Sequence, residues 1–296
     1  MKEVEKFLNT LRSEKTKQDY ERYINDFCNF KNIKNIEDFK KMTIDDYYDW
    51  NKYLKKEKNN SENTIRPKLI SINSFYDYLI TNPIYNITDN PIKDSKIIGK
   101  NKAIINPERR SWLTYNERKE FMHCCKNKRE IAIVSIFLNT ALRVSELINL
   151  PYSEYTRFYN KNGELSSYAV LTRKGGKKQK IYFNPTVTRK IDDYLKIRKE
   201  TEYDNLFVSN TGKPMSTQSI DRTIRKIAKK AGIQKRVSAH SLRRTAATDM
   251  YNNGYDLRTI QNVLGHSNPA TTERYIREVT DNLEDVMMDY VVGKEI

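Results

Sequence analysis

Residues 240–277 read HSLRRTAATDMYNNGYDLRTIQNVLGHSNPATTERYIR, and this stretch contains three short motifs in a fixed order. The first runs from His240 to Arg243, the second is Leu-Gly-His266, and the third is Tyr275 followed by Ile-Arg. Arg243 precedes His266 by 23 positions, and His266 precedes Tyr275 by nine. The stretch therefore offers cationic side chains, imidazoles and a phenol within one short length of chain.

Such a set suits the transfer of a phosphodiester without a metal ion. Negative charge gathers on the non-bridging oxygens during attack, and Arg supplies a planar fork that keeps its proton. A phenol with a pKa near ~10 is a weak nucleophile at neutral pH, so Tyr275 needs a base or a dense positive field. If the chain after Ala239 is helical, His240 and Arg243 lie one turn apart on one face. His240 is then the candidate base.

Each of these residues has a structural interpretation when taken alone. The chain contains 20 Tyr, and a His on a helix is more often structural than functional. The joint pattern is harder to explain by chance, because two of only three His lie in the motifs. We interpret the third, His123 beside Cys124 and Cys125, as structural, since adjacent Cys point apart on a helix and match no usual zinc spacing.

A further motif lies upstream, where Ala141-Leu-Arg143-Val-Ser-Glu146-Leu follows the apolar run 131–138. With the three motifs above, it resembles the tyrosine recombinases of the phage integrase family, including their Xer group. The resemblance implies that Glu146, at i+3, orients Arg143; an ordinary surface ion pair is the structural alternative. It also implies phosphate binding by Arg143, Arg243 and His266, proton acceptance by His240, and nucleophilic attack by Tyr275.

Residues 168–183, YAVLTRKGGKKQKIYF, contain two β-prone runs around a Gly-Gly turn, which predicts a hairpin. The segment resembles the family's hairpin with a catalytic Lys, which makes Lys174 the general acid for the leaving 5′ oxygen. Arg173 stands where the family often has Gly. Three neighbouring lysines are DNA-binding candidates: Lys177, Lys178 and Lys180. A further candidate is Arg244, which stands where the family often has His.

Composition favours a nucleic-acid partner. Lys and Arg total 54 against 38 Asp and Glu, a formal charge of +16, and the pI is about 9.5. Residues 1–100 carry a net +3 and the remaining residues +13, so the part with the motifs is the more cationic. Three Cys give no disulfide framework, and we find no signal peptide or membrane-length apolar run, so we expect a cytoplasmic protein without a membrane partner.

The predicted fold is mainly helical with a small β-sheet. Amphipathic patterns predict helices over 16–30, 44–56 and 62–79, the last two beginning after Thr43 and Ser61. This part resembles the family's four-helix core-binding domain, and the part with the motifs resembles its mixed α+β catalytic domain. We expect a core-binding domain at 1–88, a linker at 89–110, a catalytic domain at 111–280 and a C-terminal tail at 281–296.

We therefore expect a site-specific DNA recombinase that acts through a 3′-phosphotyrosyl intermediate, in integration, excision or resolution, without metal or cofactor. The alternatives are a type IB topoisomerase and a non-catalytic DNA-binding protein with this fold. The resemblance implies double-stranded DNA with paired half-sites as the partner and a homotetramer on that DNA, and leaves an accessory protein open. The tail, with apolar residues at helical spacing, is expected to dock on a neighbouring protomer; packing on its own chain is the alternative.

Overall fold

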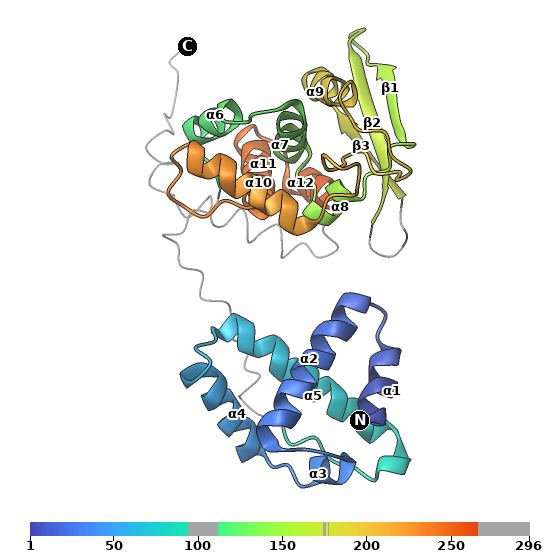
Figure 1. Cartoon of the computed structure of the whole chain (residues 1–296), viewed down its shortest axis with the longest axis vertical. Coiled ribbons are helices and arrows are strands. Elements are labelled where there is room, and N and C mark those ends of the chain that lie inside the picture. Colours follow the sequence, from blue (N-terminus) through green and yellow to red (C-terminus); the bar gives the residue numbers. More distant parts are fainter. Residues whose placement is uncertain (94–111, 174–175, 177, 266–296) are drawn as a thin grey trace, which may run out of the picture. The chain divides into compact units, whose positions relative to one another are not determined.

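The structure is a computed structural model, and it describes residues 1–93, 112–173, 176 and 178–265 (Figure 1). The chain divides into two compact units, Met1–Ile105 and Asn106–Ile296. The first is helical, and the second combines helices with a three-stranded sheet. Among the helices of these described residues, none is both long enough and apolar enough to cross a membrane.

The first unit contains five α-helices and one 3-10 turn within residues 1–93, one helix more than the four expected. The helices predicted over 16–30, 44–56 and 62–79 are confirmed as the cores of α2, α4 and α5. Thr43 begins α4 with its backbone N–H donating to Asp46 Oδ2 at 2.8 Å. The additional helix is the short α3, which Asn35 caps. The bounds are α1 Lys2–Thr10, α2 Glu14–Lys31, α3 Ile36–Lys40, α4 Ile44–Lys56, α5 Glu62–Thr81 and η1 Pro83–Tyr85.

Aromatic side chains fill the core of this unit. The Phe27 ring lies 4.9 Å, between centroids, from both Tyr47 and Trp50, and all three are fully buried. The chain stays attached to α5 beyond the last turn, because the Asn90 side chain donates to Asp77 Oδ1 at 3.0 Å and Ile92 is buried in the same core. Packing of the first unit therefore continues to Ile92.

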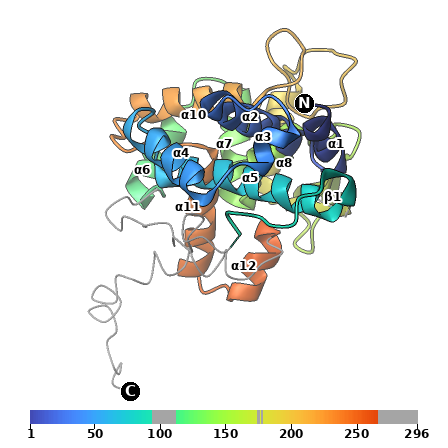
Figure 2. The ribbon, with the colours of Figure 1, turned by 90° about the horizontal axis from the view of Figure 1, so that it is seen from below.

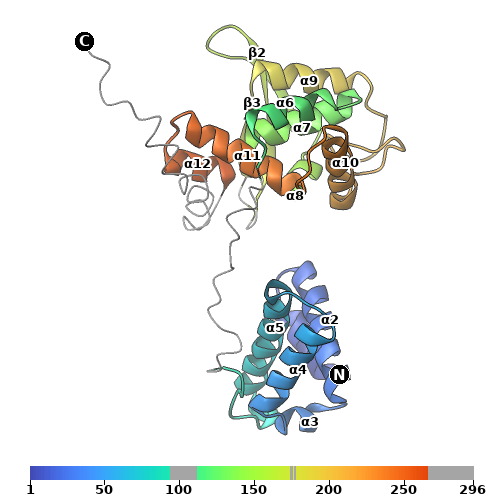
Figure 3. The ribbon, with the colours of Figure 1, turned by 90° about the vertical axis from the view of Figure 1, so that its left-hand side faces the viewer.

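The second unit places an antiparallel sheet beside a group of helices (Figure 1). Helix α9 covers one face of the sheet, and α7 lies between α9 and α11 (Figures 1 and 3). Helix α12 lies beside α11 (Figures 2 and 3). The strands, in the order β1-β2-β3, are β1 Tyr155–Tyr159, β2 Leu165–Thr172 and β3 Lys178–Phe183. The helices are α6 Tyr115–His123, α7 Lys128–Thr140, α8 Val144–Ile148, α9 Pro185–Leu195, α10 Thr217–Lys230, α11 Ala239–Asn252 and α12 Leu257–Leu264.

The hairpin predicted over residues 168–183 is confirmed as β2 and β3. Ala169 pairs with Ile181, and both side chains are buried against the helices. Their neighbours Tyr168 and Tyr182, which also pair, lie on the opposite face as the period of two requires. The register brings Thr172 opposite Lys178, so that Arg173 begins the connecting loop.

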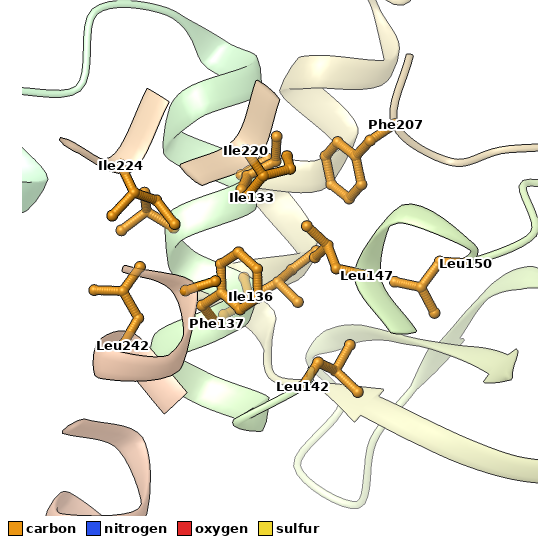
Figure 4. Close-up of a cluster of buried hydrophobic side chains, with 14 of the residues drawn as sticks. Ile133, Ile136, Phe137, Leu142, Leu147, Leu150, Phe207, Ile220, Ile224 and Leu242 are labelled. Atoms are coloured by element: carbon orange, nitrogen blue, oxygen red, sulfur yellow. The ribbon is translucent and has the colours of Figure 1, made fainter. Parts of the chain in front are cut away.

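The buried apolar side chains of the second unit gather around α7 (Figure 4). Ile133, Ile136 and Phe137 of α7 meet side chains from α8, α10 and α11, and the residues labelled there also include Leu142, Leu147, Leu150, Phe207, Ile220, Ile224 and Leu242. Because this core fixes α7, it also fixes Ala141, the residue at which α7 ends in a left-handed conformation with φ 53°. The first arginine motif follows directly.

Candidate active site

Arg143 occupies the N-cap position of α8, and Glu146 holds it from the third position of that helix. The Arg143 backbone N–H donates to Glu146 Oε2 at 2.8 Å, and its Nη1 donates to Oε1 at 2.8 Å. One carboxylate therefore fixes both the backbone and the guanidinium of Arg143. The Arg143 side chain is 41% exposed and that of Glu146 is 10% exposed, so a largely enclosed carboxylate holds a guanidinium that faces solvent.

Arg243 lies on α11 and is 2% exposed. Its Nη1 donates to the Ala141 carbonyl at 2.7 Å and its Nη2 to the Leu264 carbonyl at 2.8 Å. The same Nη1 lies 3.8 Å from Glu146 Oε2. Arg243 thus joins the ends of α7 and α12, and the left-handed turn at Ala141 aims one of these carbonyls at the guanidinium.

His240 lies one turn before Arg243 on α11, which confirms the predicted helix. The two residues differ in solvent exposure: Arg243 is buried, whereas His240 is exposed. Desolvation by neighbouring atoms, followed by the positive charges of Arg244, Arg243 and Arg143, lowers the pKa of His240 below its usual value. The imidazole is therefore neutral at neutral pH, the state that can accept a proton.

The end of α12 meets these arginines. Gly265 ends the helix with φ 61°, and its carbonyl accepts from Arg143 Nη2 at 3.3 Å. The Leu264 carbonyl accepts from both Arg243 and Arg173, the latter at 2.9 Å. His266 follows Gly265 directly in the chain. The first two motifs found in the sequence therefore converge on the one around Arg143.

Arg173 is the residue of this site that the sequence interpretation missed. In the sequence it stands only where the family pattern often has Gly, but in the structure its side chain is 10% exposed and its Nη1 lies 3.7 Å from Glu146 Oε1. Three guanidinium groups thus surround one carboxylate within 4 Å, from Arg143, Arg173 and Arg243. The cluster carries excess positive charge, which suits an anionic ligand.

The remaining site candidates are described in part. Lys178 and Lys180 lie on β3, the first with its Nζ 3.9 Å from Glu154 and the second with its Nζ 4.4 Å from the Tyr168 ring centroid. Arg244 lies on α11, half-buried, with its charge lowering the pKa of His240. Four candidates lie outside the described residues, as does the tail: Lys174, Lys177, His266 and Tyr275.

Two family models together cover most of the chain. The model of the phage integrase family matches residues 111–281, and the model of the phage integrase N-terminal SAM-like domain matches residues 4–82. The chain belongs to the phage integrase family of tyrosine recombinases. It is therefore an enzyme that recombines DNA at specific sites through a covalent tyrosyl intermediate, which confirms the recombinase interpretation of the sequence.

Individual relatives of this tyrosine recombinase are Xer proteins. It is 33% identical over 268 residues to the tyrosine recombinase XerC of Caldanaerobacter subterraneus subsp. tengcongensis, covering 86% of this chain and 70% of the relative. It is 30% identical to the tyrosine recombinase XerC of Listeria welshimeri, covering 97% of this chain and 96% of the relative. The expected Xer-like membership is confirmed.

Solved structures share the fold. The crystal structure of XerA recombinase matches with a TM-score of 0.51 and 26% identity, over 99% of this chain and 100% of that one. A lambda integrase dimer bound to a COC′ core site matches with a TM-score of 0.70 over 100% of this chain and 98% of that one. Its identity of 16% supports a common fold alone.

Proposed function

We propose that this recombinase cleaves a DNA strand with the following division of work. Arg143, Arg243 and His266 hold the scissile phosphate, and Glu146 orients Arg143. The Tyr275 hydroxyl oxygen attacks phosphorus and passes its proton to His240. As the new phosphorus–oxygen bond forms, the bond to the 5′ oxygen breaks and Lys174 protonates that oxygen. The products are a 3′-phosphotyrosyl bond and a free 5′ hydroxyl, and attack by another 5′ hydroxyl reverses the sequence.

The observation that carries this proposal is the shared position of Arg143 and Arg243. Both guanidinium groups contact Glu146, and both donate to carbonyls at the end of α12, Arg143 to that of Gly265 and Arg243 to that of Leu264. Fixed cationic donors of this kind stabilise charge that develops in a transition state, because they need no reorganisation as the reaction proceeds.

The lowered pKa of His240 supports its role as the proton acceptor. A protonated imidazole has no lone pair with which to accept the proton of Tyr275, and desolvation together with the nearby arginine charges opposes protonation of His240. As pH falls through the lowered pKa, the fraction of competent enzyme falls with it. Cleavage should therefore persist at pH values below the ordinary His pKa before it declines.

The experiment that tests the function uses DNA selected by the protein from a random pool. The selected site is placed in a nicked duplex, so that the cleaved strand loses its short 3′ portion and the covalent complex accumulates. An adduct that survives denaturation on this duplex, and is absent on a scrambled duplex, supports the proposal. Relaxation of a supercoiled plasmid without the site would instead support topoisomerase chemistry.

We predict that Lys174→Ala slows cleavage of an ordinary substrate and spares a substrate with a 5′-thio leaving group. A general acid contributes about 10²- to 10⁴-fold when the leaving group is poor and is unnecessary when it is good. The measurement is the rate of adduct formation on both substrates. Lys178→Ala is the control. Lys178 is an exposed lysine near Glu154, and its removal should weaken both reactions equally because it weakens DNA binding. An equal loss of cleavage rate on both substrates in the Lys174→Ala variant would show that Lys174 is not the general acid.

We propose further that the protein binds double-stranded DNA with paired half-sites and forms a homotetramer on that DNA, with Lys177, Lys178, Lys180 and Arg244 contacting phosphates. An accessory protein is compatible with this assembly. We also propose the cytoplasm as its compartment, because free thiols persist in a reducing environment. The three cysteines are Cys28, Cys124 and Cys125, and all are free.

Deleting residues 281–296 tests the assembly. We predict unchanged binding to a single half-site and weaker formation of the two-site complex, because an apolar tail that packs on another protomer contributes only to assembly. Gel shifts on one-half-site and two-site probes, with the melting temperature, separate the cases. A melting temperature lower by many degrees, with half-site binding lost as well, would show that the tail packs on its own chain.

A further inference from the structure

Arg173 occupies a constrained place at the start of the loop between β2 and β3. Its carbonyl accepts from the Gly176 N–H at 3.0 Å, which closes a turn in that loop. Its side chain turns away from the loop toward α12, where Nη1 donates to the Leu264 carbonyl at 2.9 Å and Nη2 to the Val263 carbonyl at 3.1 Å. These carbonyls belong to the last turn of α12, which lacks helical partners and favours a cation.

Burial of this guanidinium is costly. Desolvation lowers the pKa of Arg173, and the charge of Arg143 lowers it further, while Glu146 opposes both. A surface Lys or the Gly common in the family would avoid this cost. The two carbonyl bonds and the shared carboxylate hold the side chain in one position in spite of it.

The absence of a side chain at Gly265 makes room for the Arg173 guanidinium. A Cβ at Gly265 would overlap the Arg173 guanidinium, its nearest atom being Nη1. Gly265 also has φ 61°, which other residues adopt only with strain. The β2–β3 hairpin and the end of α12 therefore contact each other where the Arg173 guanidinium occupies the space that a side chain at residue 265 would need.

We propose that Arg173 is a positioning residue that clamps the last turn of α12 to the β2–β3 hairpin and so fixes the two catalytic segments relative to each other. Lys174 follows Arg173 and His266 follows Gly265 directly in the chain, and consecutive Cα atoms are ~3.8 Å apart. Movement at the clamp is therefore transmitted to both. This inference rests on the proposed roles of Lys174 and His266.

The test compares Arg173→Met with Arg198→Met in the full-length protein. Arg198 is a matched control because it also donates to backbone carbonyls, at Tyr203, Asn205 and Leu206, on a loop rather than on α12. Both variants should lower the melting temperature. At a temperature where both are folded, Arg173→Met should slow adduct formation at saturating DNA by roughly 10- to 100-fold, the effect of a displacement of about 1 Å, with half-site affinity retained. Arg198→Met should cleave at the wild-type rate.

Arg173→Lys should recover part of the rate, because a Lys can reach one carbonyl where the Arg fork reaches two. Wild-type cleavage by Arg173→Met, or a loss wholly explained by weaker DNA binding, would overturn the inference. If the wild-type protein forms no adduct, the proposed function fails instead, so the two failures are distinguishable.

A thermodynamic cycle tests the clamp without DNA. Gly265→Ala should lower the melting temperature strongly in the Arg173 protein, where the methyl group meets the guanidinium. In the Arg173→Gly background the overlap is gone, and only backbone strain remains. The destabilisation should then be clearly smaller. Equal destabilisation in both backgrounds would show that the two positions do not constrain each other.

Discussion

Replacing Tyr275 by Phe is expected to abolish covalent attachment to DNA and to retain duplex binding, because only the oxygen proposed as the nucleophile is removed. In the proposed mechanism this oxygen alone attacks phosphorus, so the expected loss is complete rather than partial. The measurement is the denaturation-resistant adduct on a nicked substrate, with half-site affinity determined in parallel by gel shift.

Tyr255→Phe provides the matched control for that variant. Tyr255 is an exposed tyrosine of the same domain, 56% accessible, and loses the same hydroxyl group. It should form adduct at the wild-type rate. An adduct at the wild-type level from Tyr275→Phe would instead show that another residue is the nucleophile. The control variant already tests Tyr255 for that role, and Tyr251 and Tyr290 would be the next to substitute.

Glu146→Gln should cost the protein both stability and activity. The carboxylate compensates Arg143 directly and lies within 4 Å of the buried Arg173 and Arg243. Removing one partner from a buried ionic group leaves uncompensated charge and costs about 3–5 kcal/mol. For a domain of this size that corresponds to a fall in melting temperature of roughly 6–20 °C. Cleavage should fall as well, since Arg143 loses the group that orients it.

The control for this variant is Asp193→Asn. Asp193 forms an ion pair with Lys196 at 2.9 Å, but both side chains are exposed, so solvent screens the pair and the melting temperature should hardly change. The melting temperature of both variants is measured from thermal unfolding curves recorded by circular dichroism. A Glu146→Gln protein as stable as Asp193→Asn would mean that the arginines are compensated by solvent, and the carboxylate would not be the centre of the cluster.

Local sequence patterns were enough to predict the longer helices of the first unit, the β2–β3 hairpin and the order of the motifs. Helix starts such as Thr43 depend on groups three residues apart, and the β2–β3 hairpin depends on alternation around a Gly-Gly turn, so both are local signals. The pairing of Arg143 with Glu146 was also predictable, because the two residues are three positions apart. The identity of the family followed from the same short motifs.

How those motifs share one site could be seen only once the chain was folded. Arg243 contacts Ala141 and Leu264, which lie 102 and 21 positions away, and it is buried although His240, one turn earlier, is exposed. Arg173 reaches a carbonyl 91 positions away and replaces the Gly that a family pattern predicts. No local periodicity encodes such contacts, because they arise when the α7 core and the sheet bring distant chain ends together. The burial and charge of a side chain depend on those neighbours rather than on its own position in the sequence.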